Sequence, residues 1–240
     1  MPTTEPAALF LPGGIMPASL SYGALLGILG DSIRAFPKDL AVYDADTPPA
    51  DYSLDLEVES LLRAANQAGL DRFHLVGYSV GGTIALLCAE RHGQRVESLV
   101  LFEPTVIDSA QLERILAAGP DPRQQTQMML RTGAAPPMAP PPSGSPPAWM
   151  AKRPAAFVPI MRACRDAVPQ LGPGLRRFEG RALYVLGEDS NPEFFDPERI
   201  GALLPQIEID TFPGCSHPNP PFRAAPDQTA EQLRAFWNVT

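Results

Sequence analysis

In the first half of the chain, short apolar runs alternate with stretches in which apolar residues recur at helical spacing. The apolar runs predict strands at residues 7–11, 39–44, 72–77 and 96–102, and the amphipathic stretches predict helices at residues 18–30, 54–68 and 83–91. Strands that alternate with helices in this way are typical of βαβ units, whose strands pair in parallel. We therefore predict an α/β fold with a mostly parallel sheet.

The pattern changes between residues 104 and 180, which hold 14 of the 29 prolines and only two helical candidates, residues 109–118 and 157–167. Proline lacks the amide donor that a central strand needs, and the proline-dense run 136–147 is expected to be extended or a flexible loop. The alternation then resumes, with predicted strands at residues 182–186 and 207–212 and predicted helices at residues 197–204 and 227–237. These boundaries predict a core formed by residues 1–104 and 180–240, interrupted by a proline-rich cap at residues 105–179.

Composition limits the class of protein. A chain of 240 residues, 45% of them hydrophobic, is long enough for one large core with an inserted subdomain. The formal net charge is −8 and no long cluster of lysine and arginine occurs, which disfavours binding to nucleic acid or to an anionic membrane. The expected partner is a small-molecule substrate, and the composition leaves the oligomeric state open.

Location and metal content are also constrained by the sequence. No run approaches the roughly 18 to 20 apolar residues of a membrane helix, and the first residues lack a signal-peptide pattern, so a cytoplasmic protein is expected. The cysteines, Cys88, Cys164 and Cys215, are odd in number and widely spaced, which indicates neither a disulfide framework nor a zinc site. We expect no cofactor and no metal.

The residues with the clearest chemical signal are Gly77-Tyr78-Ser79-Val80-Gly81, which follow an apolar run and precede a helix of small residues. A G-x-S-x-G motif in this setting presents its serine as a nucleophile on a sharp turn. Gly77 and Gly81 are needed because a side chain at either position would collide with the neighbouring turn. The Val80 amide, at the start of the helix, would face a developing oxyanion. The alternative is a serine that merely caps an ordinary helix.

Two further segments accompany this motif: Leu11-Pro12-Gly13-Gly14 after the first strand, and Phe212-Pro213-Gly214-Cys215-Ser216-His217 near the end. Together the three segments resemble the α/β-hydrolase fold superfamily, in the branch that holds small esterases, proline iminopeptidase-like enzymes and haloalkane dehalogenase-like enzymes. The resemblance covers residues 6–104 and 180–238 and not the cap. It implies the α/β-hydrolase fold, a mostly parallel sheet flanked by helices.

The resemblance also implies roles for individual residues. The glycine turn would supply the second oxyanion-hole amide from Gly14, or from Ile15 if the loop is shifted by one, although Pro12 stands where the family has histidine. Since a serine hydroxyl needs a general base, one of the three histidines is required. His217 matches the family's late histidine loop in position and chain order. His74 and His92 are interpreted as structural.

The acid that orients the histidine has two candidate positions. The family usually places it after the strand that follows the cap, where Ser190 occupies the expected position and Asp189 lies one residue early. Other branches place it after the strand that precedes the cap, where this chain has Glu103. We favour Glu103, because a carboxylate at the carboxyl end of a strand lies at the edge where open α/β sheets bind ligands.

These residues predict a serine hydrolase that cleaves a carboxylic ester or thioester of a small or medium hydrophobic substrate through an acyl-enzyme on Ser79. Serine rather than aspartate as nucleophile argues against dehalogenase or epoxide hydrolase chemistry. The alternatives are a lyase, cyclase or C–C bond-cleaving enzyme on the same scaffold, and a catalytically silent binding protein. Tyr78, Trp149 and Phe157 are the candidate substrate-binding residues, although the latter two would equally serve to dock the cap.

Overall fold

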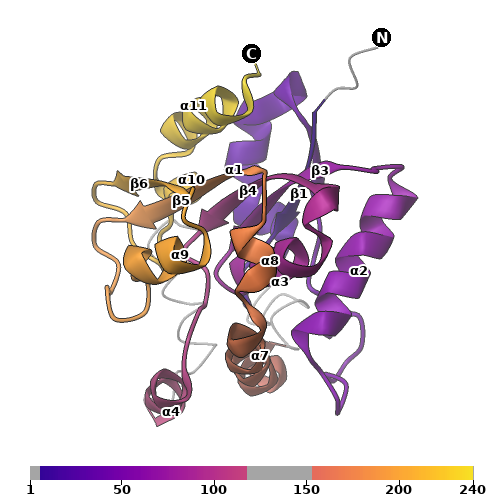
Figure 1. The fold of residues 1–240 in the computed structure, drawn as a ribbon, viewed down its shortest axis with the longest axis vertical. Coiled ribbons are helices and arrows are strands. Elements are labelled where there is room, and N and C mark those ends of the chain that lie inside the picture. Colours follow the sequence, from indigo (N-terminus) through magenta and orange to yellow (C-terminus); the bar gives the residue numbers. More distant parts are fainter. Residues whose placement is uncertain (1–5, 118–152, 240) are drawn as a thin grey trace, which may run out of the picture.

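A six-stranded parallel sheet forms the centre of the computed structural model, which describes residues 6–117 and 153–239 (Figure 1). The strands are β1 (Ala7–Leu11), β2 (Arg34–Pro37), β3 (Phe73–Tyr78), β4 (Val96–Phe102), β5 (Arg181–Gly187) and β6 (Glu208–Phe212). Their order across the sheet is β2-β1-β3-β4-β5-β6, and all five pairings are parallel. The predicted α/β fold is confirmed.

Helices cover both faces of the sheet. They are α1 (Ala18–Leu29), α2 (Leu54–Gln67), α3 (Val80–His92), α4 (Ser109–Ala117), α7 (Arg153–Ala167), α8 (Pro173–Arg176), α9 (Pro197–Leu203), α10 (Pro221–Ala224) and α11 (Pro226–Trp237). Alternate residues of the central strands enter two separate cores, because successive side chains of a strand point to opposite faces. Leu9 and Leu75 pack on the side of α2 and α3, whereas Phe10 and Val76 pack on the side of α1 and α11.

One predicted strand is wrong. Residues 39–44 do not pair with the sheet; the edge strand is β2, and residues Ala41–Tyr43 form a single 3₁₀ turn. The amides of Ala41 and Val42 donate to the buried carboxylate of Glu57 on α2, at 2.7 and 2.9 Å. These donors are therefore unavailable to a ladder, and a tertiary contact has overridden the local apolar pattern.

The chain between β4 and β5, residues 103–180, is called here the connecting segment. Although this segment separates them in sequence, the two strands are neighbours in the sheet, so both halves of the chain build one sheet. The predicted helices at 109–118 and 157–167 correspond to α4 and to most of α7. These two helices lie together at the bottom of Figure 1. The proline-dense run 136–147 lies outside the described residues.

Within the described part of the chain, no helix has the length and apolar character needed to cross a membrane.

Candidate active site

Ser79 occupies a strained turn between β3 and α3. Its φ of 54° lies in the left-handed region, and its amide donates to the Phe102 carbonyl at 2.9 Å. A Cβ at Gly77 would lie 2.4 Å from the Gly81 carbonyl oxygen, and a Cβ at Gly81 would lie 2.4 Å from the Leu11 carbonyl oxygen. Both glycines of the motif are thus required by close backbone approach, which is how this turn exposes a serine at a helix N-terminus.

Thr105 holds Ser79 from the side of β4. The Ser79 hydroxyl lies 3.1 Å from the Thr105 hydroxyl, and the Thr105 amide donates to the Ser79 carbonyl at 3.1 Å. Ser79 is 8% exposed and faces a cavity. Sequence reasoning did not find Thr105, since a threonine three residues after a strand matches no motif.

The side chain of His217 meets that of Glu103. His217 Nδ1 lies 3.0 Å from Glu103 Oε2, and the Glu103 side chain is fully buried immediately after β4, with a φ of 47°. Its other oxygen, Oε1, accepts from the Gly187 amide at 2.8 Å and from the Ser190 hydroxyl. A buried carboxylate is stable only when hydrogen-bonded, and this one receives all three donors. Since Nδ1 faces Glu103, Nε2 is the imidazole nitrogen left for another partner.

Asp189, the second acid candidate, lies elsewhere. Its side chain is exposed, and its amide donates to the Cys215 carbonyl at 2.9 Å. The structure therefore brings Glu103, not Asp189, to His217. Ser190, which occupies the position where the resemblance expects an acid, donates its hydroxyl to Glu103 instead.

The ring of His217 is held by aromatic contacts. It stacks on Phe195, with 4.1 Å between ring centroids, and lies 5.0 Å from the ring of Tyr78. The Tyr78 hydroxyl donates to the His217 carbonyl. Burial raises the pKa of Tyr78 well above its ordinary range, so this phenol stays protonated and remains a donor. These contacts limit the orientations open to the imidazole.

The glycine turn after β1 lies directly over the serine. A Cβ at Gly13 would lie 2.8 Å from the Tyr78 ring and 3.4 Å from the Ser79 Cβ. Gly14, Ile15 and Val80, the candidate oxyanion-hole residues, all line the cavity that contains Ser79. Their backbone amides are the groups that could face a developing negative charge.

Two hydrogen bonds support the glycine turn. The Tyr43 hydroxyl donates to the Gly14 carbonyl, and the Gly81 amide donates to the Pro12 carbonyl at 3.1 Å. Tyr43 belongs to the 3₁₀ turn whose amides bind Glu57. The glycine turn is thus anchored by a side chain of the 3₁₀ turn and by a backbone amide of α3, and position 12 takes part only through its carbonyl.

The cavity has a volume of about 330 Å³ and is lined mainly by apolar side chains. Helices α4 and α7 contribute Ile115, Phe157, Ile160 and Met161. Tyr78 and Phe157, two of the predicted substrate-binding residues, both line it, whereas Trp149 lies outside the described residues. A largely apolar cleft with a few polar groups is the usual form of a small-molecule site.

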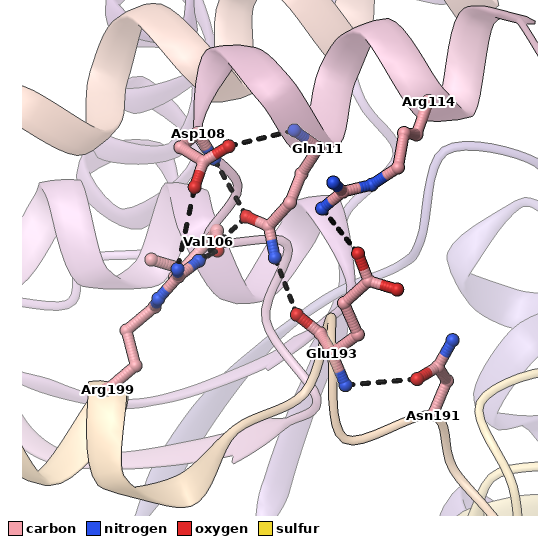
Figure 2. A network of polar contacts seen from close by, with 7 residues as sticks. All are labelled: Val106, Asp108, Gln111, Arg114, Asn191, Glu193 and Arg199. Carbon is pink, nitrogen blue, oxygen red and sulfur yellow. Dashed lines mark hydrogen bonds and ion pairs between the residues drawn. The ribbon is translucent and has the colours of Figure 1, made fainter.

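A polar network ties the start of the connecting segment to the loop after β5 (Figure 2). The Gln111 side-chain amide donates to the Glu193 carbonyl at 2.5 Å, and Gln111 and Asp108 exchange two hydrogen bonds at the start of α4. Arg199 Nη1 donates to the Val106 carbonyl and to Gln111 Oε1. Because Phe195 follows Glu193 closely, this network fixes the loop whose aromatic ring stacks on His217.

The other two histidines lie outside this cluster. His74 Nδ1 lies 2.9 Å from the Ser98 hydroxyl, and its ring packs against Trp237. His92 ends α3, at the opposite end of that helix from Ser79. Over residues 6–117 and 153–239, histidine, cysteine and carboxylate side chains form no group of three suited to a metal ion.

Comparisons with known proteins agree with the fold. Residues 8–232 match a family model described as the alpha/beta hydrolase family. N-formylmaleamate deformylase of Pseudomonas putida is 29% identical over 101 residues, a stretch that spans 41% of this chain and only 38% of that protein.

Two solved structures share the fold over almost the whole chain. A meta-cleavage product hydrolase from Pseudomonas fluorescens has a TM-score of 0.67 at 16% identity, covering 97% of this chain and 90% of its own. A structure from a study of carboxylesterases of the thaumarchaeon Nitrososphaera gargenis has a TM-score of 0.69 at 15% identity. The match covers 98% of this chain and 90% of that chain.

Proposed function

Because the chain belongs to the alpha/beta hydrolase family, we propose that it is a serine hydrolase that works through an acyl-enzyme on Ser79. The observation that carries the proposal is the hydrogen bond of 3.0 Å between His217 Nδ1 and Glu103, formed at the cavity that Ser79 also lines. The proposal is supported by a serine and a histidine that line one cavity and by a buried acid bonded to that histidine, the three groups that nucleophilic acyl transfer uses.

In the first half of the reaction, the Ser79 hydroxyl turns from Thr105 to His217 and loses its proton to Nε2 as Oγ attacks the carbonyl carbon. Glu103 holds the tautomer with a proton on Nδ1 and stabilises the imidazolium that forms. The amides of Val80 and of Gly14 or Ile15 bind the oxyanion. The oxyanion then collapses, the bond from the carbonyl carbon to the leaving group breaks, and the leaving group takes the proton of the imidazolium, so that the acyl-enzyme remains.

In the second half, a water molecule gives a proton to His217 Nε2 and attacks the acyl carbon. The second oxyanion collapses, the bond to Ser79 Oγ breaks, and Oγ regains the proton from the imidazolium. The products are the free acid and the unchanged enzyme.

The proposed substrate is a carboxylic ester or thioester with a small or medium apolar part. The apolar walls of the cavity and its volume of about 330 Å³ support a substrate of that size. A second candidate is the hydrolysis of an amide bond, favoured by the match to a deformylase over part of the chain. Both reactions use the same acyl-transfer chemistry and differ in the leaving group.

The proposal is tested with p-nitrophenyl esters of acetate, butyrate and octanoate. Ser79→Ala is expected to lower kcat by at least about 10⁴-fold, since the nucleophile is lost. Ser53→Ala is the matched control, because Ser53 precedes α2 and forms no side-chain cap hydrogen bond. Full activity in Ser79→Ala would overturn the proposal. So would a wild-type enzyme that neither cleaves any of these esters nor reacts with a serine-directed fluorophosphonate.

A further inference from the structure

Arg223 on α10 is a lining residue of the cavity that the mechanism does not use. Its Nε donates to the Ser21 carbonyl at 3.4 Å and its Nη2 to the Ser21 hydroxyl at 3.0 Å. The remaining nitrogen, Nη1, is buried and has no hydrogen-bond partner. Buried donors in proteins are almost always paired, so an unpaired one beside a ligand cavity calls for an acceptor that the ligand brings.

The charge of Arg223 is also uncompensated. Among the described residues that line the cavity, it alone carries a permanent charge, and no carboxylate of the described ranges forms an ion pair with it. Its guanidinium lies over the rings of Tyr78 and Phe222, 5.6 and 5.3 Å from the ring centroids. Burial lowers the pKa of Arg223, yet an arginine side chain in a protein remains a cation at any physiological pH.

The position of this cation relates it to the reacting groups. Arg223 and His217 both lie beside the ring of Tyr78: the guanidinium carbon is 5.6 Å and the imidazole centroid 5.0 Å from the centroid of that ring. Tyr78 also immediately precedes Ser79 in the chain. The guanidinium carbon and the imidazole centroid are therefore no more than about 11 Å apart, and Arg223, His217 and Ser79 line one cavity. A substrate a few bonds long could thus place an anion at Arg223 and a carbonyl carbon at Ser79.

We propose that Arg223 binds a carboxylate of the substrate, so that the preferred substrates are acyl compounds that carry a carboxylate a few bonds from the scissile carbonyl. This inference rests on the proposed function for the acyl transfer itself. The guanidinium supplies a charge-assisted donor in planar geometry, which suits a carboxylate oxygen. The otherwise apolar lining strengthens the attraction, because charges interact more strongly away from water.

The test compares two esters of the same length, p-nitrophenyl hydrogen adipate and p-nitrophenyl hexanoate, with uncatalysed hydrolysis subtracted. The quantity measured is the ratio of their kcat/KM values. We expect the wild-type enzyme to favour the adipate ester by at least about 10-fold, and Arg223→Gln to lower the ratio by about 100-fold, mainly through KM. Arg223→Lys should restore part of the ratio. Arg63→Gln, which removes an exposed arginine of α2, should leave it unchanged.

A purely structural role for Arg223 predicts a different result. Loss of its hydrogen bonds to Ser21 would lower the melting temperature and reduce activity on both esters equally, so an unchanged ratio would overturn the inference. A wild-type enzyme that cleaves the hexanoate ester without preferring the adipate ester would also overturn it, while leaving the proposed function intact.

Binding of free adipate, followed by calorimetry, separates the two proposals when no ester is cleaved. If Ser79 is inert but adipate binds to the wild-type protein and not to Arg223→Gln, the hydrolase proposal fails and the carboxylate site stands. If adipate binds equally to both proteins, or to neither, the carboxylate site fails.

Discussion

The two sides of the cavity are built from different interactions. On the sheet side, Ser79, Glu103 and His217 are each held by hydrogen bonds at the carboxyl ends of the strands. On the opposite side, α4 and α7 of the connecting segment contribute apolar side chains. Hydrogen-bonded positions depend on particular atoms, whereas apolar walls depend on volume, which several side chains can fill. Changes on the sheet side should therefore abolish chemistry, and changes on the α7 side should alter substrate choice.

The acid gives the largest expected effect on the sheet side. Glu103→Gln keeps the shape of the side chain but loses the carboxylate that orients His217, and it is expected to lower kcat by about 10⁴-fold. Asp189→Asn, a matched change at an exposed acid on the neighbouring loop, should change kcat by less than about 3-fold. Steady-state kinetics on p-nitrophenyl butyrate measure both. The reverse order of effects would contradict the assignment of Glu103.

The glycines of the turn give the next effect. Gly81→Ala forces a Cβ to 2.4 Å from the Leu11 carbonyl oxygen, and we expect it to lower the free energy of unfolding by about 3 to 5 kcal/mol or to prevent folding. Gly23→Ala in α1, where a Cβ meets no atom within 4 Å, is the control and should raise stability by about 0.5 to 1 kcal/mol. Thermal and urea unfolding measure both. Equal stability of the two variants would show that the close approach is absent.

Loss of the hydrogen bond that supports the glycine turn should lower kcat less than loss of the acid. Tyr43→Phe removes the hydroxyl that donates to the Gly14 carbonyl, and we expect kcat to fall about 10-fold with little change in KM, since small misplacements in a site are costly. Tyr52→Phe, which removes one of three donors to Glu57 and acts one contact further away, should have a smaller effect. A larger loss in Tyr52→Phe than in Tyr43→Phe would argue against support through the Gly14 carbonyl.

Substitutions on α7 should change which ester chain length the enzyme prefers. Phe157→Ala enlarges the cavity, and the ratio of kcat/KM for octanoate over acetate esters should rise about 10-fold, since burying even one further methylene in an apolar pocket is worth about that factor. Phe157→Leu should give an intermediate ratio. A uniform loss of activity on all chain lengths, as for a sheet-side variant, would contradict the division between the two sides.

Much of the fold was predictable because it follows from local patterns. The alternation of apolar residues identified the central strands and the flanking helices, and the glycines around Ser79 identified the turn. The edge strand β2 was missed because the apolar residues at 39–44 form a turn held by Glu57, a contact made across 15 and 16 residues. A contact over that distance in the sequence cannot be predicted from the local pattern of apolar residues.

The site was predictable only in part, for the same reason. Motifs pointed to Ser79 and His217, but the choice between Glu103 and Asp189 depends on which side chain reaches the imidazole from neighbouring strand ends. Arg223 and Ser21 lie 202 residues apart, and Tyr43 and Gly14 lie 29 apart. Only the fold brings these pairs together.

The central claim, an acyl-enzyme on Ser79, is tested most directly by trapping it. Wild-type enzyme turning over p-nitrophenyl hexanoate is quenched in acid within the first turnovers and digested, and its peptides are analysed by mass spectrometry. We predict a hexanoyl adduct on the peptide that contains Ser79, absent from Ser79→Ala. Release of p-nitrophenol with no adduct, or with the adduct on a different residue, would contradict the account.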